Sequence, residues 1–103
     1  MHQVQRRAWQ RFPVELPIVI PSSGQIPEIK GVTRDVSLGG VFFYVDSWPF
    51  EAHDIEYRVI MPPQLVEGGK ARAFCKGRVV RVERDLECGR MGVAATIDSY
   101  TLS

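Results

Sequence analysis

The sequence predicts an all-β protein, a six-stranded antiparallel β-barrel with a C-terminal helix that is short or absent.

 Apolar and polar residues alternate in most segments, which is the period of a half-buried strand. Clusters of Gly, Pro and Ser separate these segments at short intervals, and a closed barrel is the arrangement that hides the strand edges. At 103 residues the chain has the size of a single domain with one core.

The first expected strand covers residues 14–20, in which alternate positions are apolar: Val14, Leu16, Ile18 and Ile20. Prolines at positions 13, 17 and 21 make this segment a poor helix and indicate a strand at the edge of the sheet. A polar turn at residues 22–25 leads into an extended run from about residue 28 to residue 36. These two segments are expected to form a hairpin.

Four further strands are expected downstream. Residues 41–45, with the sequence Val-Phe-Phe-Tyr-Val, are rich in aromatic and β-branched side chains and should lie centrally in the sheet. Residues 55–61 alternate and end at two prolines, and residues 71–83 form a long strand in which Gly77 suggests a bulge or a sharp bend. Residues 91–97 form the last strand, so that the barrel is expected to cover residues 13–98.

Residues 1–12 are expected to form a flexible basic arm, because they contain Arg6, Arg7 and Arg11 and no acidic residue. Such a cluster attracts phosphates or acidic surfaces even though the net charge of the whole chain is only +1 at pH 7. A solvated tail would have the same composition, so the arm alone does not identify a site.

Side chains typical of catalytic and metal sites are sparse. His2 lies in the arm and His53 in a loop, and neither is placed like a catalytic base. Cys75 alternates with apolar neighbours, which is typical of a core residue, whereas Cys88 falls in a charged turn. No group of Cys, His and acidic residues has the spacing of metal ligands. We therefore expect neither an enzyme nor a bound metal or cofactor.

The sequence also limits where the protein is expected to work. Two cysteines do not make the disulfide framework of a small secreted domain. No apolar stretch has the length of a membrane span, and the polar start of the chain is unlike a signal peptide. The expected location is the reducing cytoplasm.

Two motifs are expected to meet at one end of the barrel. Arg7 and Arg11 stand directly before the first strand, and the turn after the second strand supplies a carboxylate, a hydroxyl and two glycines from Asp35, Ser37, Gly39 and Gly40. A hairpin returns the chain to the end where it began, so the arm can reach this turn. Asp and Ser often stabilise turns without binding anything. Together with arginines, however, they suit a guanine nucleotide, because arginine and carboxylate side chains recognise the base edges and glycine lets a ligand approach the backbone.

The order Arg-x-x-x-Arg and then Asp-x-Ser-x-x-Gly resembles the two signatures of the PilZ domain family, here formed by Arg7, Arg11, Asp35, Ser37 and Gly40. The resemblance extends over essentially the whole chain and implies a receptor for the bacterial second messenger cyclic di-GMP. It implies that the two arginines clamp the ligand, that Asp35 and Ser37 contact a guanine, and that Gly40 keeps the approach open. Arg6 is similar to the extra basic residue with which some members hold an intercalated pair of ligands.

The expected receptor signals to a downstream protein partner when ligand binding orders its arm. Two other functions remain as alternatives. Small β-barrels with basic and aromatic faces bind single-stranded nucleic acid, but the three arginines of the arm stand before the barrel and not across a groove, which disfavours that partner. A PilZ-like adaptor that binds only proteins is the second alternative, and such members usually lack the signature residues.

Overall fold

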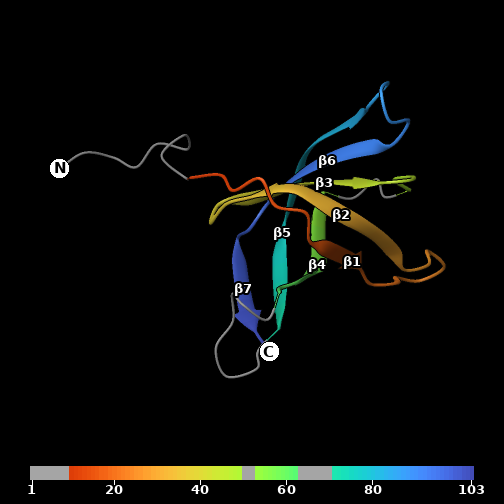
Figure 1. Cartoon of the computed structure of the whole chain (residues 1–103). Coiled ribbons are helices and arrows are strands. Elements are labelled where there is room, and N and C mark those ends of the chain that lie inside the picture. The colour runs from red at the N-terminus through yellow and green to blue at the C-terminus, as the bar shows by residue number, and fades with distance from the viewer. Residues whose placement is uncertain (1–9, 50–52, 63–70) are drawn as a thin grey trace.

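The structure, a computed structural model, describes residues 10–49, 53–62 and 71–103 of the chain. Seven strands are present in this part, as Figure 1 shows: β1 (Pro17–Ile20), β2 (Ile29–Val36), β3 (Gly40–Val45), β4 (Asp54–Ile60), β5 (Arg72–Arg84), β6 (Met91–Thr96) and β7 (Ser99–Leu102). All their pairings are antiparallel. No helix in the described residues could cross a membrane.

Six of the strands close into a barrel in the order β1-β2-β3-β6-β5-β4, and β4 returns to pair with β1. The predicted six-stranded antiparallel barrel is therefore confirmed. The predicted hairpin of the first two strands and the central place of β3, between β2 and β6, are also confirmed. The prediction that the first strand lies at an edge is wrong, because β1 pairs with β2 on one side and β4 on the other.

The seventh strand was not predicted. The first half of β5 pairs with β7, through Ala73–Lys76, and its second half pairs with β6. A strand therefore continues the sheet past residue 98, where the sequence was expected to end the barrel. Residues 99–102 are exposed at all four positions, so they lack the buried alternate positions from which the other strands were predicted.

Successive side chains along each strand point alternately into and out of the barrel, and those that point inward form the core. The most deeply buried large side chains include Phe43 and Tyr57, whose ring centroids are 6.4 Å apart. The Tyr57 hydroxyl donates to the backbone carbonyl of Thr96 at 2.8 Å, so the one polar atom of this ring is satisfied inside the barrel. These contacts join β3, β4 and β6 around one core.

Gly77 allows two strands to approach closely instead of forming the predicted bulge. A Cβ atom at this position would lie 1.8 Å from the Thr96 carbonyl oxygen, which is far inside van der Waals contact. The irregularity in β5 lies further along, between Val79 and Arg81. Only glycine leaves room for the chain that crosses from β6 to β7 at this point.

Thr33 ties the start of the barrel to β2. Its side chain is buried, and its hydroxyl accepts from the Leu16 amide at 2.8 Å and donates to the Val14 carbonyl at 2.6 Å. The Thr33 amide in turn donates to the Leu16 carbonyl at 2.9 Å. These bonds hold the segment that precedes β1 against β2.

Replacing Thr33 by Val is expected to lower the free energy of unfolding by about 1 to 2 kcal/mol, because a buried amide and a partly buried carbonyl lose their partner. Urea denaturation of the variant would measure the loss. Thr33→Ser keeps the hydroxyl and serves as the control, which is expected to lose less. Equal stability of Thr33→Val and the unmutated chain would show that these bonds contribute nothing.

Candidate functional site

A bulge in β2 turns Asp35 to the outside of the barrel. Thr33 lies opposite Phe43 and points into the core, but the register then shifts, so that Asp35 lies opposite Phe42. Regular alternation would have directed residue 35 to the inside together with Thr33. Arg34 is the extra residue of the bulge, and its insertion directs the Asp35 carboxylate to the outer face of the barrel.

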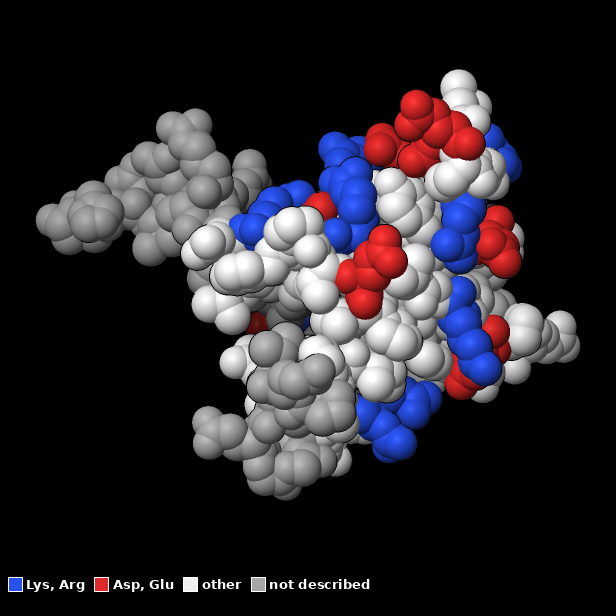
Figure 2. Space-filling view, viewed as in Figure 1, with Lys and Arg blue, Asp and Glu red and all other residues white. Residues whose placement is uncertain are grey.

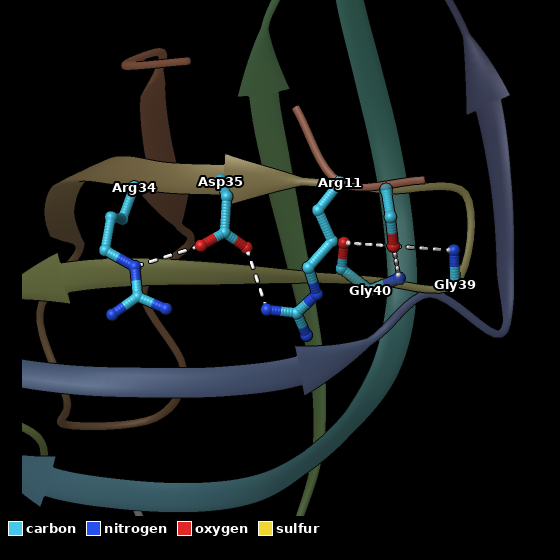
Figure 3. Close-up of polar contacts among 6 residues, drawn as sticks. Arg11, Arg34, Asp35, Gly39 and Gly40 are labelled. Carbon is cyan, nitrogen blue, oxygen red and sulfur yellow. Dashed lines mark hydrogen bonds and ion pairs between the residues drawn. The ribbon is translucent and has the colours of Figure 1, made fainter. Parts of the chain in front are cut away.

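Asp35 binds two arginines, one through each carboxylate oxygen. Arg11 Nη1 lies 3.2 Å from Oδ1, and Arg34 Nε lies 2.9 Å from Oδ2. Figure 3 shows the two guanidinium groups on either side of the carboxylate. The Asp35 side chain is only 15% exposed, compared with 65% for Arg11 and 48% for Arg34, so the arginines cover the acid and remain open to solvent themselves.

The backbone before the barrel is paired with the end of β2, which places Arg11 at this site. Phe12 and Val36 exchange backbone hydrogen bonds of 2.8 and 3.0 Å. The expected meeting of the arm with the turn after the second strand is therefore seen for residue 11. Figure 2 shows basic side chains gathered beside the point where the described chain begins.

Ser37 stabilises the turn between β2 and β3. Its hydroxyl accepts from the Gly39 amide at 3.2 Å and from the Gly40 amide at 3.1 Å, and lies 3.3 Å from the Gly40 carbonyl. Gly40 also lies close to β6, since a Cβ atom there would be 2.8 Å from the Ala95 carbonyl oxygen. In this structure Ser37 therefore shapes the turn, and Gly40 is needed for packing between strands.

Arg34 and Phe42 were not predicted from the sequence to belong to the site. The Arg34 guanidinium carbon lies 3.9 Å from the centroid of the Phe42 ring, which is a cation–π distance. The hydrogen bond to Asp35 raises the pKa of Arg34, so its charge is secure. A bulge cannot be read from strand alternation, and without it Arg34 resembles any exposed arginine of a strand.

Arg6 and Arg7, the other two arginines predicted for the site, lie outside the described residues, as does His2. His53 is exposed and lies directly before β4. Within the described ranges no group of His, Cys and acidic side chains could hold a metal ion.

The arrangement of Arg11, Asp35 and the Ser37 turn can be compared with known proteins. A family model described as the PilZ domain matches residues 5–101. The chain belongs to the PilZ domain family. The predicted membership of the PilZ domain family is thereby confirmed.

Solved structures share the PilZ fold. The Bacillus subtilis inhibitor of motility, MotI/DgrA, matches with a TM-score of 0.75 and 17% identity, over 98% of this chain and 46% of that one. The PilZ domain of CeSA from a cellulose-synthesizing bacterium matches with a TM-score of 0.56 and 23% identity, over 87% of this chain and 83% of that one. This PilZ domain thus spans less than half of the MotI/DgrA chain. Comparison with the curated proteins finds no match.

The two thiols of this PilZ domain differ in accessibility. Cys75 is buried and Cys88 is exposed. Burial raises the pKa of the Cys75 thiol to about 11, which keeps it protonated and unreactive at neutral pH. The chain therefore presents one accessible thiol among the described residues.

We expect iodoacetamide at pH 8 to label Cys88 rapidly and Cys75 only after unfolding, as mass spectrometry of the labelled peptides would show. Above about pH 9 the unfolded chain releases the Cys75 proton that the folded chain keeps. The contribution of this group to stability is therefore complete below pH 9 and is lost as the pH rises through about 11. Equal labelling of both thiols in the native protein would contradict the burial of Cys75.

Proposed function

We propose that this PilZ domain is a non-enzymatic receptor for cyclic di-GMP, which binds at the end of β2 between the arginine arm and the turn at residues 35–40. The observation that carries the proposal is the contact of Arg11 with Asp35 at 3.2 Å, which joins two motifs that are 24 residues apart in the chain. Membership of the family supports the choice of ligand.

The chemistry of the site suits a guanine nucleotide. A carboxylate can accept more than two hydrogen bonds, so Asp35 can still receive the N1 and N2 donors of guanine beside an arginine. The Arg11 guanidinium is largely exposed and can move to the phosphates or to guanine O6 and N7. Gly39 carries no side chain that would stand between the turn and a base.

The arm completes this proposed site. Arg7 would bind beside Arg11, and Arg6 would help to hold a second ligand molecule, so that two molecules of cyclic di-GMP bind per chain. Ordering of the arm around the ligand would change the surface that a downstream protein partner recognises. Action in the cytoplasm is part of the same proposal.

Isothermal titration with cyclic di-GMP tests the proposal, with saturation near two ligands per chain expected. Cyclic di-AMP should bind much more weakly, because adenine does not offer the two donors that Asp35 accepts from guanine. Absence of binding to cyclic di-GMP would refute the receptor. Binding of an oligonucleotide, with affinity that falls by about 0.9 log unit per phosphate contact for each decade of salt, would favour the nucleic-acid alternative instead.

A further inference from the structure

The two arginines that bind Asp35 are held to very different degrees. Arg11 makes one contact with the carboxylate, at 3.2 Å, and 65% of its side chain is exposed. Arg34 donates from Nε at the shorter distance of 2.9 Å, and its guanidinium also lies over the Phe42 ring. An exposed ion pair with a single contact contributes little and exchanges readily. Arg34 is therefore the better fixed of the two.

The ring beneath Arg34 is itself held in place. Phe42 is only 3% exposed, and the edge of its ring meets Tyr44 at a centroid distance of 5.5 Å and an angle of 80°. The ring lies over Gly92, where a Cβ atom would come within 2.6 Å of its Cζ. Because Gly92 has no side chain, the Phe42 ring packs directly on the backbone of β6. The Arg34 guanidinium in turn packs on this fixed ring.

We propose that Arg34 is a positioning residue of the nucleotide site, which holds Oδ2 of Asp35 so that Oδ1 is presented to the ligand. Arg11 occupies Oδ1 in the free protein and leaves it when ligand binds. A group that is already oriented loses less conformational entropy on binding, which raises affinity. This inference rests on the proposed function, because it assigns a role within that same site.

Cyclic di-GMP titration of Arg34 variants tests the role. Arg34→Ala is expected to weaken binding by about tenfold or more, the effect of losing one charge-assisted hydrogen bond. Arg34→Lys keeps the charge but has neither the planar fork nor the Nε donor, so it is expected to weaken binding to a similar extent. Thermal melting of both variants would show that the barrel remains folded.

Arg81→Ala is the matched control for the loss of charge. Arg81 is 59% exposed and its guanidinium carbon lies 5.9 Å from the same Phe42 ring, but it pairs with Glu83 and not with Asp35. Its removal is expected to weaken binding by less than about threefold. If Arg34→Lys binds like the unmutated chain, or if both alanine variants lose the same affinity, charge alone acts and the inference is overturned.

A measurement without ligand separates this inference from the proposed function. In NMR spectra of the free protein, the Arg34 Nε–H resonance is expected to shift strongly on Phe42→Leu and on Asp35→Asn, but not on Arg81→Ala. A resonance that is insensitive to the first two changes would overturn the fixed position of Arg34, whether or not nucleotide binds. Failure of the unmutated chain to bind cyclic di-GMP would instead refute the proposed function.

Discussion

Replacing Asp35 by Ala is expected to weaken cyclic di-GMP binding by about 1 to 3 kcal/mol, or roughly 10- to 100-fold, while the barrel stays folded. The variant loses the acceptor of a guanine edge, and it also releases Arg11 and Arg34 from their common partner. The turn should survive, because it is Ser37 and not Asp35 that accepts from the amides of residues 39 and 40. Isothermal titration and thermal melting on the same sample measure both effects.

Asp46→Ala provides a control for this experiment. Asp46 also pairs with an arginine, Arg90, at 3.3 Å, but its side chain is 91% exposed and it follows the far end of β3. Its replacement is expected to change neither affinity nor melting temperature appreciably. A folded Asp35→Ala protein that binds at unmutated strength would remove Asp35 from the site, and a less stable one with unchanged affinity would make its role structural.

Replacing Gly77 by Ala is expected to lower the free energy of unfolding by about 2 to 3 kcal/mol, the range for a group forced into a packed position. The added Cβ would meet the carbonyl of Thr96, which is backbone and cannot rotate away. The same carbonyl accepts from Tyr57, so moving it would also disturb a buried hydrogen bond. Urea denaturation would measure the loss, with the adjacent exposed position changed as Lys76→Ala for comparison. Equal stability of the two variants would contradict the close approach.

Much of the fold could be predicted because the barrel buries one face of each strand. The alternation of Ile18 with its neighbours, and of Phe43 and Val45 in β3, follows directly from that burial. Proline was misleading in β1: Pro17 is the first residue of the strand, where a missing amide is tolerated within a sheet as well as at its edge. Strand β7 buries no face, so alternation gave no sign of it.

The site was predicted in part for a related reason. Hairpin geometry was enough to predict that Arg11 meets Asp35. Arg11 precedes β1 and Asp35 lies near the end of β2, and these antiparallel strands bring the two residues to the same end of the barrel. The contact of Arg34 with Phe42 depends on a bulge, which shifts the register by one residue and leaves no mark on the apolar pattern. Close approach at Gly77 and Gly92 depends on distant strands, which the order of residues does not reveal.

Amide hydrogen exchange with and without cyclic di-GMP tests the location of the proposed site most directly. The proposal predicts that residues 6–11 and residues 35–40 both gain protection when ligand is added, while β4 and the first half of β5 do not change. Equal protection of residues 6–11 in the two states would contradict the arginine clamp. Protection confined to another face of the barrel would contradict the site itself.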